Sequence, residues 1–170
     1  MSTETTERYR RALETRDVEL ALSGFAPDVI VHSPLTSRVR FTGHAELKPL
    51  LEVAYTHLRD VRFHTDTGDA TTRVVVYTAR IGAEEIEEAA VLKIGEDGLI
   101  TEVTLFVRPL PGLVALMDAF GPDIARRNGR EFAARLLSLA AKPLVGMVRL
   151  GVRGAVEPGR ETVAGHGGPA

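Results

Sequence analysis

The sequence contains no cysteine and no tryptophan among its 170 residues. Without cysteine, disulfides, thiolate nucleophiles and cysteine-ligated metal sites are excluded. Neither a glycine-rich phosphate loop nor a dinucleotide-binding fingerprint is present, so we expect no cofactor. The start, Met1–Glu4, is polar and no apolar stretch follows it, so we expect no signal peptide and a cytoplasmic protein.

Histidines are present, but their spacing does not suggest a metal site. His32, His44, His57 and His64 show no metal-ligand spacing, and His57 and His64 straddle an expected helix–strand boundary. A site would require convergence in three dimensions, and we expect no metal.

The overall balance is that of a globular domain, with 44% hydrophobic and 26% charged residues. Charge is unevenly distributed: residues 126–153 carry 7 Lys and Arg against 1 Asp or Glu, whereas residues 1–125 carry 13 against 20. An acidic body therefore precedes a basic C-terminal segment, which raises the question of a partner for that segment.

Hydrophobic periodicity predicts helices first and strands later. We expect helices over residues 3–16, 17–24 and 44–58, the last allowing Pro49 only in its first turn. A strand at 29–33 and a loop at 35–43 lie between them. Strands follow at 61–67, 71–81, 84–94 and 100–108, the last two joined by a hairpin turn at 96–98. Residues 111–120 and 123–150 read as helical. This order indicates an α+β fold with an antiparallel sheet.

Short signatures occur in one order along the chain. They are Glu7-Arg8-Tyr9, Phe25-Ala26-Pro27-Asp28, Val31-His32-Ser33-Pro34, Phe41-Thr42-Gly43, Gly95-Glu96-Asp97-Gly98-Leu99-Ile100 and Phe106-Val107-Arg108-Pro109. With them the chain resembles the nuclear transport factor 2-like superfamily, and more closely its SnoaL-like branch, over about residues 5–112.

The resemblance implies N-terminal helices packed on a strongly curved antiparallel sheet that forms a conical pocket. We therefore expect a cone domain over 1–121, a basic amphipathic helical extension over 122–153 and a disordered tail over 154–170. Members of the superfamily include steroid isomerases, cyclases, epoxide hydrolases, dehydratases and proteins without enzyme activity, so the fold does not give the function.

The ketosteroid isomerase pattern transfers only in part. Tyr9 matches that family's substrate-polarising tyrosine, but Ser33 stands where the proton-shuttling aspartate is expected. The position of the second aspartate corresponds to about Ala90. The resemblance therefore does not support that isomerase activity as such.

Alternation along the strands predicts which side chains face the pocket. If Ser33 points inward, as the resemblance implies, so do Val31 and, on the later strands, Tyr77 and Glu88. The predicted catalytic residues are Glu88, Tyr9 and Tyr77, and the predicted ligand-binding residues are Phe25, Ser33, Tyr55, Val75, Ala90, Val103 and Leu105. A slip of one residue would instead turn His32, Glu87 and Phe106 inward. A mostly apolar lining with a few polar groups is typical of a small-ligand site.

Glu88 is the sharpest candidate. A carboxylate among Ile86, Ala90 and Leu92 would lose its hydration, which raises its pKa and suits it to act as a general acid or base. The alternative is that Glu88 belongs to a solvated acidic run at a strand end. The other candidates also have alternative, purely structural roles. Tyr9 would be a core residue and Tyr77 a favourable strand residue, and Ser33 would cap the turn before Pro34.

Two functions of different kinds follow. The first is a pocket protein that binds an apolar metabolite and, if it is an enzyme, acts as a cofactor-free isomerase, cyclase or dehydratase. The second is a non-catalytic module that uses the basic helix at 130–150 for a protein or membrane-surface contact; packing on the body or a second subunit is favoured there over the membrane.

No nucleic-acid motif is present. The superfamily commonly pairs through the outer sheet face, which implies a homodimer through Val74, Val76, Thr78, Thr104 and Phe106.

Overall fold

The computed structural model describes residues 2–35, 37 and 39–127 of the chain. Ten elements follow one another: α1 (Ser2–Thr15), α2 (Val18–Leu22), β1 (Phe25–His32), β2 (Arg40–Thr42), α3 (Gly43–His57), β3 (Leu58–Gly68), β4 (Thr72–Ile81), β5 (Glu84–Ile94), β6 (Ile100–Arg108) and α4 (Leu110–Arg127). The α+β class is therefore confirmed. The residues predicted as a basic helix at 130–150 and as a tail at 154–170 lie outside the described part.

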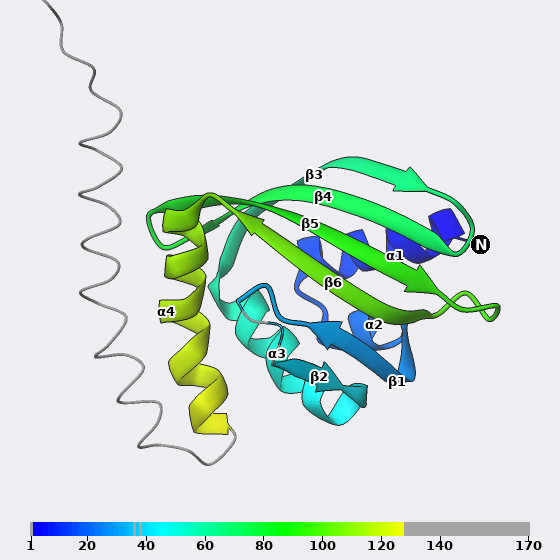
Figure 1. Ribbon diagram of the computed structural model, residues 1–170, viewed down its shortest axis with the longest axis horizontal. Helices are drawn as coiled ribbons and strands as arrows, with labels where there is room; N and C mark the ends of the chain where they lie inside the picture. Colours follow the sequence, from blue (N-terminus) through cyan, green and yellow to red (C-terminus); the bar gives the residue numbers. More distant parts are fainter. Residues whose placement is uncertain (1, 36, 38, 128–170) are drawn as a thin grey trace, which may run out of the picture.

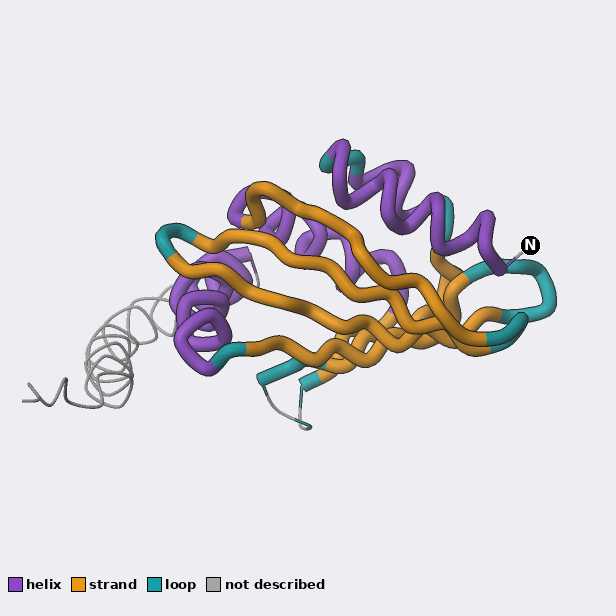
Figure 2. Tube along the Cα trace, turned by 90° about the horizontal axis from the view of Figure 1, so that it is seen from above, coloured by secondary structure: helices purple, strands orange, loops and turns teal. Residues whose placement is uncertain are grey.

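The strands form one six-stranded sheet in the order β2-β1-β6-β5-β4-β3 (Figure 1). Strands β3 to β6 are antiparallel neighbours, but β1 lies parallel to β6, so the sheet is mixed. The predicted antiparallel sheet rested on hairpins between consecutive strands, and β1 has no such link to β6. Figure 2 shows a twisted layer, and the expected strong curvature is not what the structure has.

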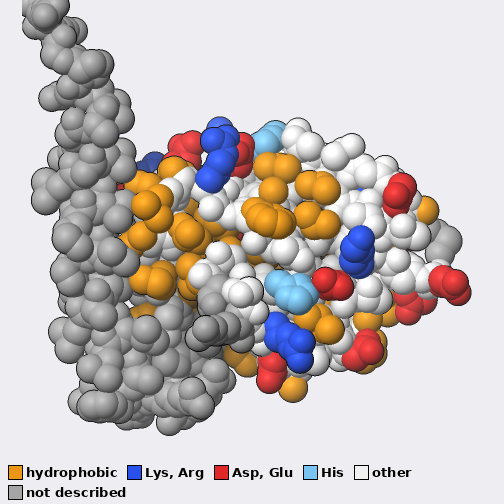
Figure 3. All heavy atoms as spheres, viewed as in Figure 1, with side chains coloured by type: hydrophobic (Ala, Val, Ile, Leu, Met, Phe, Trp, Pro, Cys, Tyr) orange, Lys and Arg blue, Asp and Glu red, His pale blue; other side chains and the backbone are white. Residues whose placement is uncertain are grey.

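The helices cover one face of this sheet. Buried side chains of α1 and α3 join those of the strands in one hydrophobic core, and α4 contacts α3, β5 and β6 at one end of the sheet (Figures 1 and 2). The opposite face carries no helix among the described residues. Figure 3 shows hydrophobic side chains gathered on this open face, where Phe106 is 58% exposed.

Local chemistry explains the helix starts. Asp17 precedes α2 and its carboxylate accepts the Leu20 N–H at 2.9 Å, as expected of a helix N-cap. Gly43 opens α3 with a φ of 70°, a conformation that favours glycine. The prediction for Pro49 was wrong: it lies in the second turn of α3, where the helix continues without that backbone donor.

Other boundaries also differ from the sequence prediction. Strand β3 begins at Leu58 rather than at 61, and α4 continues through Pro122, where a break between two helices was expected. Strand β1 begins at Phe25, four residues earlier than expected, and a register irregularity between Phe25 and Ile30 accommodates Pro27, which has no N–H for the ladder. The segment expected to be a loop at 35–43 contains the short strand β2, which pairs with the end of β1.

Alternation on the central strands follows the predicted register. Tyr77 and Glu88 lie opposite each other on β4 and β5, and both are buried. The next residue of β5, Ala89, and the preceding one, Glu87, are only partly buried. The slipped register is excluded, because it would have buried Phe106. The face of the sheet that carries Tyr77 and Glu88 is therefore the one that can form the wall of an interior site.

Candidate functional site

A cavity of about 520 Å³ lies between the helix-covered face of the sheet and helices α1, α3 and α4. Eight predicted site residues line it: Tyr9, Phe25, Ser33, Tyr55, Tyr77, Glu88, Val103 and Leu105. The structure thus brings together side chains from α1, β1, α3, β4, β5 and β6. Their binding and catalytic roles stay predictions.

Val75 and Ala90 do not line the cavity. They lie opposite each other on β4 and β5, two positions along the strands from the Tyr77–Glu88 pair. Both are almost completely buried, at 1% and 0% exposed. They face inward, as alternation predicts. They pack in the closed core next to the cavity rather than lining it.

Other lining residues were missed. Helix α3 supplies Leu47, Leu50, Leu51 and Ala54, and α4 supplies Leu116, Phe120 and Gly121. The spacing on α3 is the three-to-four-residue period of one helix face, which could have predicted this wall. Leu35 and Val39 also line the cavity although each is more than a third exposed, so they lie on its open side.

The central polar feature is the Tyr77–Glu88 pair. Tyr77 Oη donates a hydrogen bond of 2.7 Å to Glu88 Oε1, and the residues are only 2% and 5% exposed. Burial raises the pKa of Glu88 to about 7, and the bond from Tyr77 opposes that rise. The alternative of a solvated strand end is therefore wrong for Glu88.

The rest of the acidic run behaves differently. Glu87 turns to the open face, where its carboxylate pairs with Arg108 Nε and lies 3.4 Å from His64 Nε2. The hydrogen bond from Arg108 holds the pKa of Glu87 below its ordinary value. Two neighbouring glutamates therefore have opposite environments.

Two further phenols enter the cavity from the helices. Tyr9, on α1, meets the rings of Phe25 and Phe63 edge-on, with centroids 6.2 and 6.3 Å away. Burial, and secondarily Glu88, raises the pKa of Tyr9 well above its ordinary value. Burial also raises the pKa of Tyr55, on α3.

Both phenols are therefore neutral hydrogen-bond donors at physiological pH. Within the described residues, no hydrogen bond occupies the hydroxyl of Tyr9 or Tyr55, and no side-chain oxygen of that part is both buried and unpaired. Both tyrosines line the cavity, so their hydroxyls are candidates to donate a hydrogen bond to a bound molecule.

Ser33 lines the cavity but is already engaged. Its Oγ accepts the N–H of Leu35 at 3.2 Å, so it caps the turn that follows β1, as its structural reading predicted. The other charged lining residues, Arg40 and Glu46, are exposed, and Glu46 accepts the N–H of Thr42 at 2.7 Å. Glu88 is thus the buried carboxyl group of the cavity.

Histidines near the site have structural partners. His57 Nε2 lies 2.8 Å from Asp123 Oδ2 and joins α3 to α4, while His44 Nε2 lies 3.1 Å from the Phe25 carbonyl oxygen. In the described part of the chain, no group of three His, Asp or Glu side chains could hold a metal ion. None of the helices over 2–127 is both long and apolar enough to cross a membrane.

Comparison with solved structures agrees with this architecture. A steroid delta-isomerase from Pseudomonas aeruginosa superimposes with a TM-score of 0.64 at 24% identity, over 78% of this chain and 94% of that one. An uncharacterised protein with a cystatin-like fold from Silicibacter pomeroyi DSS-3 gives 0.65 at 21% identity, over 76% and 93%. At these identities the likeness shows the fold alone.

A third similar structure is an epoxide hydrolase/cyclase-like enzyme of pyran-ring formation in salinomycin. Its TM-score is 0.55 at 14% identity, over 63% of this chain and 90% of that one. No curated protein matches the chain. The family model of the SnoaL-like domain matches residues 6–103, more than half of the sequence. The chain therefore belongs to the SnoaL-like domain family.

Proposed function

We propose that this protein binds a largely apolar metabolite in its cavity and moves a proton on it without a cofactor, in the manner of an isomerase, cyclase or dehydratase. The observation that carries the proposal is the buried Tyr77–Glu88 pair at the wall of a 520 Å³ cavity. Enzymes of this type need an acid–base group whose pKa lies near the working pH, and burial raises the pKa of Glu88 to about 7.

The chemistry suits a carbon acid beside a carbonyl group. The Glu88 carboxylate removes a proton from the carbon, the C–H electron pair moves into the carbonyl group, and negative charge develops on the oxygen. A phenol hydroxyl donates to that oxygen, and we assign this role to Tyr9, which lines the cavity and whose hydroxyl has no hydrogen bond among the described residues. Glu88 then returns the proton to another carbon, so the protein ends unchanged.

Tyr77 has a different role in this scheme. Its hydroxyl keeps its proton and donates a hydrogen bond to Glu88 Oε1. This bond stabilises the carboxylate and keeps that oxygen oriented. The structures of a steroid isomerase and of an epoxide hydrolase/cyclase-like enzyme share the fold, and both names describe reactions on oxygenated carbon skeletons. They support the class of ligand.

The chain offers a convenient readout of binding. It has three tyrosines and no tryptophan, and all three tyrosines line the cavity. Tyrosine fluorescence therefore reports on the cavity without a label. We would screen steroids, aromatic polyketides and terpenoid epoxides by this signal and by thermal shift, and analyse every binder for product.

The matched variants are Glu88→Gln and Glu87→Gln, which remove one charge from neighbouring positions. We expect a ligand to bind both variants, with turnover lost only in Glu88→Gln. Binding without turnover by the wild type would overturn the catalytic half of the proposal and leave a carrier or sensor. The absence of binding by every compound class would overturn both halves.

A further inference from the structure

Helix α1 meets the sheet through polar side chains in its first half. Thr5 and Thr6 are 4% and 1% exposed, although a buried hydroxyl requires a partner. Thr5 Oγ1 donates at 2.7 Å to the carbonyl oxygen of Gly98, in the turn between β5 and β6. Thr6 Oγ1 lies 2.6 Å from Asp66 Oδ2, on β3. These contacts link α1 to two separate parts of the sheet.

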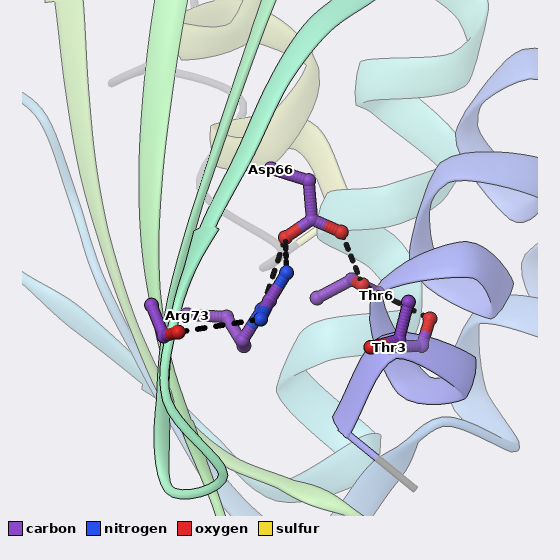
Figure 4. Close-up of polar contacts among 5 residues, drawn as sticks. Thr3, Thr6, Asp66 and Arg73 are labelled. Atoms are coloured by element: carbon purple, nitrogen blue, oxygen red, sulfur yellow. Dashed lines mark hydrogen bonds and ion pairs between the residues drawn. The ribbon is translucent and has the colours of Figure 1, made fainter.

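Asp66 is itself fixed (Figure 4). Its Oδ1 accepts from Arg73 Nε at 3.0 Å and also from Nη2 of the same guanidinium. Arg73 Nη1 reaches the Gly68 carbonyl oxygen at 3.4 Å. One carboxylate oxygen therefore pairs with the sheet and the other faces α1, so Asp66 is an anchor for the helix although its side chain is 36% exposed.

Thr6 has a single hydroxyl proton and two acceptors within reach. The Thr3 carbonyl oxygen lies at 3.1 Å and Asp66 Oδ2 at 2.6 Å. A charged acceptor at the shorter distance forms the stronger bond, so the proton belongs to Asp66. The name "α1 clasp" is used below for Thr6, Asp66 and Arg73.

The α1 clasp lies one turn before the cavity. Tyr9 follows Thr6 by three residues and shares its face of the helix. Its ring contacts Phe25 and Phe63 only by edges, and its hydroxyl has no hydrogen bond within the described part of the chain. Because no hydrogen bond from the described residues fixes the hydroxyl, its location depends on where α1 sits on the sheet.

We propose that Asp66 is a positioning residue, which acts through Thr6 to seat α1 on the sheet and thereby sets where the Tyr9 hydroxyl stands in the cavity. The importance of the Tyr9 hydroxyl position for catalysis rests on the proposed function. The seating of α1 by Asp66 does not depend on that function, and it can be measured on the full chain without any ligand.

The experiment uses NMR of protein labelled with ¹³C at tyrosine. Three tyrosine signals are expected and can be assigned with Tyr→Phe variants. Thr6→Val keeps the shape of the side chain and removes the hydroxyl, Thr6→Ser keeps the hydroxyl, and Asp66→Ala removes the acceptor. The control is Glu7→Gln, which breaks the exposed Glu7–Arg10 pair on the same helix.

We expect Thr6→Val and Asp66→Ala to shift the Tyr9 signal while those of Tyr55 and Tyr77 stay in place. Thr6→Ser should restore the wild-type position, and Glu7→Gln should leave it unchanged. An unmoved Tyr9 signal in Thr6→Val would overturn the proposal. A similar shift of all three signals would also overturn it, because that is general loosening of the fold.

If Asp66→Ala does not fold, the comparison of Thr6→Val with Thr6→Ser still tests the proposal. The result is separate from the proposed function: a compound screen without turnover leaves this prediction intact, and an unmoved Tyr9 signal leaves the role of Glu88 intact.

Discussion

Glu87 and Glu88 are neighbours on β5, yet they lie in opposite environments. The side chain of Glu87 is 27% exposed and pairs with Arg108 on the open face of the sheet, which holds its pKa below the ordinary value. Glu88 is 5% exposed and has a neutral phenol as its hydrogen-bond partner, and burial raises its pKa to about 7. The difference teaches that the face of the strand, rather than the residue type, decides the chemistry of a carboxyl group here.

The two faces of the sheet differ in the same way. The inner face is covered by α1, α3 and α4 and encloses a cavity in which a few polar groups meet apolar walls. The open face combines ion pairs with exposed apolar side chains, Phe106 foremost (Figure 3). We propose that ligand chemistry belongs to the first face and association to the second, and four experiments test that division.

The largest expected effect is on turnover. With a substrate from the screen, Glu88→Gln should lower kcat/KM by about 10²- to 10⁴-fold, the usual contribution of a general acid or base. Glu87→Gln, one residue away, should stay within about twofold of the wild type because its carboxylate points out of the cavity. Equal losses in the two variants would show that the faces do not divide the chemistry as stated.

The next effect concerns stability and pH. The folded-state pKa of Glu88 is raised to about 7, so the folded protein holds this proton more tightly than the unfolded chain does. The contribution of Glu88 to the free energy of unfolding is fully present below the unfolded-state pKa of about 4.3. It is lost as the pH rises through 7, by up to about 3 kcal/mol. Urea unfolding at pH 5 and pH 8.5 measures it.

Glu88→Gln should remove this dependence and be more stable than the wild type at pH 8.5. Glu87→Gln should instead lower the free energy of unfolding at neutral pH. Because the pKa of Glu87 is lowered, its stabilisation is present at neutral pH and is lost as the pH falls through its folded-state pKa. A wild-type stability that rises from pH 5 to pH 8.5 by the amount assigned to Glu88 would contradict its burial.

A smaller effect concerns the open face. We propose that two copies of the chain pair through it, and Phe106→Asp should weaken association by about 30-fold, since burial of a phenylalanine contributes about 2 kcal/mol. Leu110→Asp is the matched control, because Leu110 is equally exposed, at 59% against 58%, but lies on α4. Sedimentation should show a wild-type dimer at micromolar concentration. A wild-type monomer would end this proposal.

The smallest expected effect is that of Tyr77→Phe. The hydroxyl of Tyr77 stabilises the Glu88 carboxylate, and its removal should raise the pKa of Glu88 above its value of about 7. Titration of the carboxyl group by NMR measures the change. Tyr55→Phe is the control, since Tyr55 makes no hydrogen bond to Glu88, and a shift of equal size in that variant would show that the effect is not specific to the hydrogen bond.

Much of the inner face could be predicted from the sequence because alternation is a local property. The family resemblance implied that Ser33 points inward, alternation along the later strands then predicted Tyr77 and Glu88 on the same face, and both line the cavity. Local patterns do not state which strands pair, so the parallel contact between β1 and β6 was missed. They also could not separate Val75, in the closed core, from Tyr77, at the cavity.

Polar contacts between distant elements were harder to predict. Thr6 and Asp66 are 60 residues apart, and each is ordinary in its own element. Only the seating of α1 on β3 makes them partners. The basic segment at 130–150 lies outside the described residues, so the contact expected of it stays a prediction.

The most direct test of the account is an NMR pH titration of the Glu88 and Glu87 side-chain carboxyl groups in one sample of the full chain. Each can be assigned with its Gln variant, and each is the control for the other. We expect a midpoint of about 7 for Glu88 and one below the ordinary glutamate value for Glu87. A Glu88 midpoint of 4 to 5 would contradict the central claim, because it would mean a hydrated carboxylate at this position.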